Sequence, residues 1–232
     1  MESDRIFLIT VCGVTLGALL SLGLITIRRP GPAVRLLGFY TLVLSIGLAE
    51  PLIDLVPDQT ELFRSVWGGF SLLYGPLLFL YVRSRLGELS KLTRKDLIHL
   101  APFFVYQILL PLFSLIQRRD SMDQEVLDLL IYELLFLQIF TYCILCFKIL
   151  ASKKREVVSP VTKIRTAFVT TLVILSTILF LSSFTFSHLR LFFSLPLNSI
   201  FTFSIQLGLS FLIFVIALLN TENMHLEKFT TI

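Results

Sequence analysis

Long apolar runs separated by short polar segments dominate the sequence. A helix that crosses a bilayer needs about 20 mostly apolar residues, and each of these runs is long enough. The pattern therefore predicts an all-α fold, an integral membrane bundle of seven transmembrane helices. The predicted spans are Ile6–Ile27, Val34–Val56, Leu62–Val82, Leu97–Ile116, Val126–Leu150, Ala167–Phe186 and Leu191–Leu219.

The basic residues predict the orientation of these helices. Cytoplasmic loops of membrane proteins carry an excess of Lys and Arg. With the N-terminus outside, 15 of the 20 basic residues fall on the cytoplasmic side and 5 on the outer side. The sequence therefore predicts an outer N-terminus and a cytoplasmic C-terminus.

Composition supports the same class of protein. The chain is 55% hydrophobic and only 16% charged, whereas about a quarter of residues are charged in soluble domains. We expect residues 1–220 to form the transmembrane domain, and residues 221–232 to form a cytoplasmic tail or the start of a connecting helix. The first five residues lack the positive region of a secretory signal, so we expect the first helix to be retained.

The segment from Trp67 to Pro102 has the most distinctive local pattern. It places Gly75-Pro76 in the middle of an apolar span and a dense basic turn at the end of that span. Proline lacks the backbone N–H that an α-helix uses, so within lipid a neighbouring helix must satisfy the freed carbonyl. We therefore predict a kink or local widening of the third helix at Pro76, with Tyr74 and Tyr81 facing the bundle interior.

This segment contains two motifs in succession, Tyr74-Gly75-Pro76-Leu77-Leu78-Phe79-Leu80-Tyr81-Val82-Arg83-Ser84 and Lys95-Asp96-Leu97-Ile98-His99-Leu100-Ala101-Pro102-Phe103. They resemble the membrane region of the multi-pass AraC-type transcriptional regulators of bacteria. The resemblance is sharpest over residues 70–105.

The resemblance implies a seven-helix sensor in the bacterial cytoplasmic (inner) membrane, followed in that family by a cytoplasmic domain with two helix-turn-helix units. This sequence ends at Ile232. We therefore expect that the chain itself contacts no nucleic acid. Its expected partner is a small ligand or a lipid, with a homodimer as an open alternative to the monomer.

Acidic residues near the outer ends of the predicted helices are candidates for a ligand site, because ionisable groups are costly within a bilayer. Glu50 and Asp54 are four residues apart and are expected on one helix face. Together with Trp67, Tyr74 and Glu133 they would line an outward-opening pocket, with Glu50 and Glu133 as a pair of facing acids. The alternative is that the acids lie among lipid headgroups or serve helix packing.

Other kinds of chemistry have little support in the sequence. The three histidines are expected at different depths, no metal-ligand spacing is present, and the cysteines are interpreted as apolar packing residues. The seventh span has no Lys to form a retinal Schiff base. We therefore expect no enzyme, no catalytic residue, no metal site and no cofactor. Gln107, Gln138 and Gln206 are interpreted as interhelical hydrogen-bonding residues.

Two main functional hypotheses remain from the sequence. The first is a sensor that transmits a signal through the seventh helix into whatever follows Asn220. The second is a small transporter that uses the carboxylates of Glu50, Asp54 and Glu133. A membrane-embedded enzyme acting on lipid is a third and weaker alternative.

Overall fold

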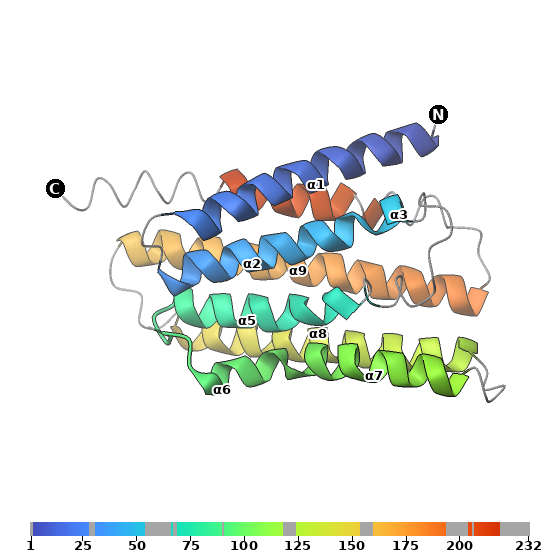
Figure 1. Cartoon of the computed structure of the whole chain (residues 1–232). Coiled ribbons are helices and arrows are strands. Elements are labelled where there is room, and N and C mark those ends of the chain that lie inside the picture. The colour runs from blue at the N-terminus through green and yellow to red at the C-terminus, as the bar shows by residue number, and fades with distance from the viewer. Residues whose placement is uncertain are drawn as a thin grey trace.

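The fold is a bundle of helices, shown by a computed structural model (Figure 1). The structure describes residues 2–27, 31–53, 66, 69–89, 91–117, 124–153, 160–193, 204–205 and 207–218. No strand occurs within these ranges, and seven helices in them have twelve or more residues. These helices are α1 (Glu2–Thr26), α2 (Pro32–Leu48), α5 (Tyr74–Arg85), α7 (Ala101–Gln117), α8 (Gln124–Lys153), α9 (Pro160–Phe193) and Leu207–Leu218. The predicted all-α fold with seven helices is confirmed to this extent.

Shorter helical segments connect or extend the long helices. They are α3 (Glu50–Ile53), the 3-10 helix η1 (Gly69–Leu73), α6 (Arg94–Leu97) and the 3-10 helix η2 (Ile98–Leu100). Figure 1 shows the long helices side by side, with α5 between α2 and α8. The end of the bundle where α5 ends and α9 begins is called the basic end here. It carries Arg83, Arg85, Lys91, Arg94, Lys95, Lys153, Lys163 and Arg165.

Small residues allow α1 and α2 to pack closely. A Cβ atom added at Gly17 would overlap the Ser45 hydroxyl of α2, and one added at Gly13 would overlap both Leu48 and Ser210. The Ser21 hydroxyl donates a 2.9 Å hydrogen bond to the Gly38 carbonyl. Helices that lack a hydrophobic driving force in lipid associate through such small-residue contacts.

Helix α5 is the centre of the bundle. Every residue from Tyr74 to Val82 is buried, on all sides of the helix. The expectation that Tyr74 and Tyr81 face the interior is confirmed, since their exposed fractions are 8% and 1%. Helix α5 has no exposed side over this range, because every residue in it is buried.

The outer faces of the surrounding helices are apolar. Exposed side chains include Leu19 of α1, Ile108 of α7, Leu134 and Leu137 of α8, and Ile178 of α9. Three helical stretches are long and apolar enough to cross a membrane, namely Phe7–Thr26, Glu133–Lys153 and Thr162–Phe186. Two shorter apolar helices are Pro32–Leu48 and Leu207–Leu218.

Two predicted spans need correction at their ends. The second span does not continue as one α-helix, because α2 ends at Leu48 and a turn at Ala49 precedes α3. Pro51 explains the break, since it has no N–H to donate to the carbonyl four residues earlier.

The sixth helix is longer than predicted. Helix α9 continues to Phe193, so His188 lies within the helix and not in an outer loop. The sequence from Ser187 to Phe193 contains neither Gly nor Pro to end it.

Candidate functional site

The five predicted ligand-site residues are not all described by the structure. Asp54 and Trp67 lie outside the described residues. Glu50 is exposed at the start of α3, Tyr74 is buried at the start of α5, and Glu133 is partly exposed on α8. Helix α5 lies between the α2–α3 segment and α8 (Figure 1). The prediction that these side chains line one pocket therefore stays a prediction.

Glu133 bonds a residue that the sequence analysis did not pair with it. Its Oε1 lies 2.6 Å from His188 Nε2, which joins α8 to α9. The other ring nitrogen, Nδ1, lies 2.9 Å from the Phe184 carbonyl. The structure thus pairs Glu133 with His188, whereas we expected it to face Glu50.

Both ring nitrogens of His188 have hydrogen-bond partners, Nδ1 within α9 and Nε2 on α8. A carbonyl only accepts hydrogen bonds, so the Phe184 contact suits the tautomer that carries a proton on Nδ1. Glu133 and His188 form a hydrogen-bonded pair that joins α8 to α9.

Tyr74 is fixed by its neighbours on two helices. Its ring stacks on Phe180 of α9 with centroids 5.5 Å apart and an interplanar angle of 12°. Its hydroxyl oxygen occupies the space that a side chain at position 47 of α2 would need. Tyr74 therefore serves as a packing residue between α2 and α9 at the start of α5.

The segment before Pro76 is irregular. Residues Gly69–Leu73 form a 3-10 helix, and α-helical geometry begins at Tyr74. In an α-helix the Leu72 carbonyl would accept from the N–H of residue 76, which proline lacks. Gln138 of α8 donates to this carbonyl from Nε2 at 3.1 Å. A side chain of a neighbouring helix thus replaces the missing backbone donor, as expected for proline in an apolar helix.

A second glutamine acts in the same way nearby. Gln107 of α7 donates from Nε2 to the Val66 carbonyl at 3.0 Å. The backbone also comes close to aromatic rings here, since a Cβ at Gly69 would lie 2.8 Å from Tyr106, and one at Gly75 would lie 2.8 Å from Tyr142. The interpretation of Gln107 and Gln138 as interhelical hydrogen-bonding residues is confirmed: Gln138 binds η1 just before α5, and Gln107 binds the backbone ahead of η1. Gln206 lies outside the described residues.

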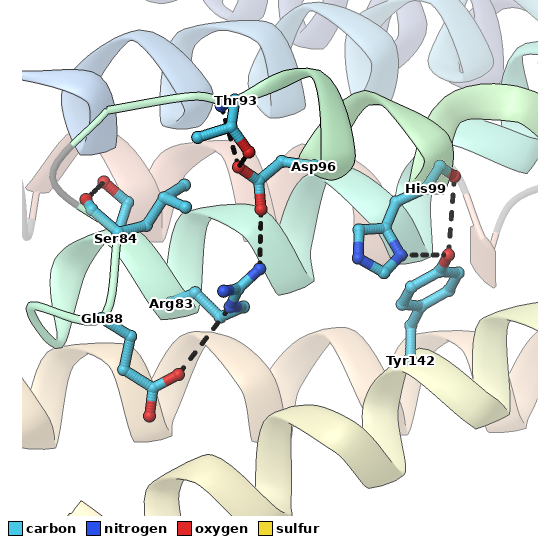
Figure 2. Close-up of polar contacts among 8 residues, drawn as sticks. Arg83, Ser84, Glu88, Thr93, Asp96, His99 and Tyr142 are labelled. Atoms are coloured by element: carbon cyan, nitrogen blue, oxygen red, sulfur yellow. Dashed lines mark hydrogen bonds and ion pairs between the residues drawn. The ribbon is translucent and has the colours of Figure 1, made fainter.

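At its other end, α5 is bound to the following turn by an ion pair (Figure 2). Gly87 has a φ of +83°, a conformation that glycine adopts without steric cost, and the chain reverses there. Arg83 Nη1 then donates to Asp96 Oδ1 at 2.8 Å. Asp96 Oδ2 accepts from the Thr93 N–H at 2.9 Å and the Thr93 hydroxyl at 2.6 Å. We call Arg83, Thr93 and Asp96 the basic-end clamp.

The basic-end clamp also holds the start of the next helix. Thr93 and Asp96 form a capping box at the start of α6. One turn later, His99 Nδ1 lies 3.1 Å from the Tyr142 hydroxyl of α8 (Figure 2). The ring of Phe79 packs against both of these side chains. Nothing in the sequence pattern predicts this contact of His99 with α8. The pattern Thr-x-x-Asp is the signal that predicts the capping box.

We expect a pH-dependent contribution of Asp96 to stability. Hydrogen bonds from Thr93 and the ion pair with Arg83 hold the pKa of Asp96 below its usual value. A depressed folded-state pKa stabilises the fold above the unfolded-state pKa, and this stabilisation is lost as pH falls through the folded-state pKa. Asp96→Asn should therefore lower the free energy of unfolding by about 1 kcal/mol at neutral pH.

Denaturation in detergent micelles at several pH values measures this effect. The gap between wild type and Asp96→Asn should begin to narrow near pH 4, the unfolded-state pKa of aspartate, and should close only below the depressed folded-state pKa of Asp96. Glu88→Gln is the matched control, because the Arg83–Glu88 contact is 3.8 Å and partly exposed, and such pairs contribute little. A gap that persists unchanged in acid would contradict the role assigned to the Asp96 charge.

No protein-family model, curated protein or solved structure matches the chain. Within the described residues, no group of three or more His, Cys, Asp or Glu side chains is placed to hold a metal ion. The site features are thus the hydrogen-bonded pair Glu133–His188, the junction between η1 and α5 that Gln138 binds, and the basic-end clamp. The junction between η1 and α5 and the basic-end clamp lie at opposite ends of the segment from Gly69 to Asp96.

Proposed function

We propose that the chain is a seven-helix protein of the bacterial cytoplasmic membrane, with its N-terminus outside and its C-terminus in the cytoplasm. The helices that are long and apolar enough to cross a membrane, and their exposed apolar faces, support insertion. The basic residues gathered at one end of the bundle support the orientation.

We further propose that the chain is a sensor and signal-transducing module, in keeping with its resemblance to the membrane region of AraC-type regulators. The observation that carries this proposal is the construction of α5. It is buried on all sides, begins at an irregular junction held by Gln138, and ends at the clamp formed by Arg83 and Asp96. A shift of the backbone at the start of α5 would therefore move the clamp at its end.

The signal would be transmitted by a change of helix type at the junction, where the 3-10 helix η1 meets the α-helix α5. A 3-10 helix rises about 2.0 Å per residue and an α-helix about 1.5 Å. Conversion of the five residues of η1 to α-helix would shift α5 along its axis by about 2.5 Å. A ligand that binds more tightly when η1 is in one of these two helical forms would then change the position of the basic end.

A fusion protein tests this proposal. A transcription reporter domain that acts in the cytoplasm is joined after Ile232, and its output is compared at equal amounts of membrane protein. Gln138→Met and Pro76→Ala change the junction, so we expect each to alter the output several-fold. Leu134→Ala, on the outward face of α8, is the control and should leave it unchanged.

Two results would contradict the proposal. A complete lack of reporter output, with the fused domain found on the outer side of the membrane, would reject the proposed cytoplasmic C-terminus. Equal output from wild type, both junction variants and the control would reject signalling through the junction.

The Glu133–His188 pair favours a second candidate, a transporter that moves protons or cations. A hydrogen-bonded carboxylate and imidazole that join two apolar helices are a feature of proton pathways. Purified protein in liposomes separates the two functions, since a transporter would give proton flux that Glu133→Gln abolishes. We expect flux no higher than in empty liposomes.

A further inference from the structure

The hydroxyl of Tyr81 lacks a hydrogen-bond partner in the part of the chain that the structure describes. The side chain lies on α5 and is only 1% exposed, so water does not reach it from outside the bundle. A buried polar group without a partner is costly, and most such groups in native proteins bind a water, an ion or a ligand.

Arg165 provides a second buried donor without a partner among the described residues, on the helix whose Phe168 packs against Tyr81. Its Nε atom is buried and has no acceptor among the described residues. Arg165 lies on α9 one turn before Phe168, whose ring meets the Tyr81 ring edge-on at 6.4 Å. The charges of Arg85 and Arg165 both act on the Tyr81 hydroxyl.

The Tyr81 hydroxyl and Arg165 Nε both need an acceptor. Arginine only donates, and a tyrosine hydroxyl donates readily to an anion. Two acids of the basic end, Glu88 and Asp96, are paired with Arg83. A phosphate group would satisfy both donors, because its oxygens accept several hydrogen bonds and arginine binds phosphate strongly.

The depth of the site also suits a phosphate. Tyr81 lies four residues before the end of α5, about 6 Å along the helix axis. Arg165 lies five residues after the start of α9, about 7.5 Å along its axis. Both donors are therefore about one to one and a half turns from the helix ends, at the level where lipid headgroups meet the bundle.

We propose that Tyr81 and Arg165, with Arg85 nearby, bind a phosphate group between α5 and α9 at the basic end. The phosphate comes from the headgroup of an anionic phospholipid or from a small phosphorylated solute. Because the site contacts α5, occupancy would favour one position of this helix. The binding site itself does not depend on the proposed signalling function.

Lipid-dependent thermal stability tests the site. The protein in dodecyl maltoside micelles, which contain no phosphate, is titrated with phosphatidylglycerol in one arm and with inorganic phosphate in another, at constant ionic strength set with chloride. Wild type should show a saturable rise in Tm in at least one arm. Phosphatidylglycerol alone identifies a lipid headgroup, and an equal response to inorganic phosphate identifies a free anion.

Three variants assign the effect to the proposed residues. Tyr81→Phe removes only the hydroxyl, and Arg165→Gln removes the charge. Each should weaken the apparent affinity by about tenfold, the loss of one hydrogen bond to a charged group. Lys163→Gln, an exposed position on the same helix, should bind as wild type does.

The proposal is overturned by either of two results. One is a wild-type Tm that neither phosphatidylglycerol nor phosphate raises. The other is a saturable rise that Tyr81→Phe and Arg165→Gln leave unchanged, or that Lys163→Gln weakens to the same degree. Tyr81→Phe keeps the ring that packs on Phe168, so it provides a variant expected to fold.

Discussion

Gly47→Ala should destabilise the bundle by about 2–3 kcal/mol, although it adds only one methyl group. A Cβ atom at this position of α2 would overlap the hydroxyl oxygen of Tyr74. The tyrosine has little room to move, because it is buried and its ring stacks on Phe180. Equilibrium unfolding of the purified protein in detergent measures the loss.

Removal of the Tyr74 hydroxyl tests the cause of this loss of stability. In Gly47→Ala/Tyr74→Phe the new methyl group would meet the ring carbon Cζ at 3.1 Å, a tight contact that a small shift relieves. The double variant should therefore recover most of the stability lost by Gly47→Ala, relative to Tyr74→Phe alone. Equal losses in the two backgrounds would show that the methyl group disturbs something other than Tyr74.

Gln138→Met should cost about 2 kcal/mol, because it removes the donor that binds the Leu72 carbonyl. Methionine keeps the length of the side chain and packs well in apolar surroundings. The loss is therefore assigned to the hydrogen bond and not to a cavity. The same unfolding measurement applies, with Leu134→Met as a control at an exposed position of α8.

Pro76→Ala provides the matched background for this experiment. Alanine supplies a backbone N–H at position 76, which an α-helix would direct to the Leu72 carbonyl. Gln138→Met should then cost less than about 0.5 kcal/mol in the Pro76→Ala background. If the cost is the same in both backgrounds, the glutamine does not replace the donor that proline removes.

The positions of most helices follow from the sequence, because apolar run length determines where a helix is buried or faces lipid. The predicted spans Ile6–Ile27 and Val126–Leu150 lie within a few residues of α1 and α8. The helix ends are harder to predict. The turn at Ala49 and the extension of α9 to Phe193 depend on local backbone hydrogen bonding, which hydropathy does not report.

Contacts between helices were much less predictable. Helical periodicity places residues on a face, but it does not indicate which helix that face meets. The sequence does not predict the pairing of Glu133 with His188, because the predicted sixth span ends at Phe186 and leaves His188 outside the helix. The partner of Gln138 was implied by the missing donor of Pro76, yet its identity required the structure.

Two signals in the sequence were present but not used. Gly13 and Gly17 are four residues apart, a spacing that favours close helix contacts in membranes, and they face α2 and the last described helix. Thr93 and Asp96 have the spacing of a capping box. Both signals are local, and each would have located one contact of the bundle.

The two arrangements proposed for α5 are most directly tested by a distance measurement in lipid nanodiscs. Spin labels at Lys91, after α5, and at Lys148, on α8, occupy exposed positions near the basic end, with the three native cysteines replaced. Wild type should give two populations of distances, and Pro76→Ala should favour one of them. A single distribution that is identical in wild type and Pro76→Ala would contradict a switch at this junction.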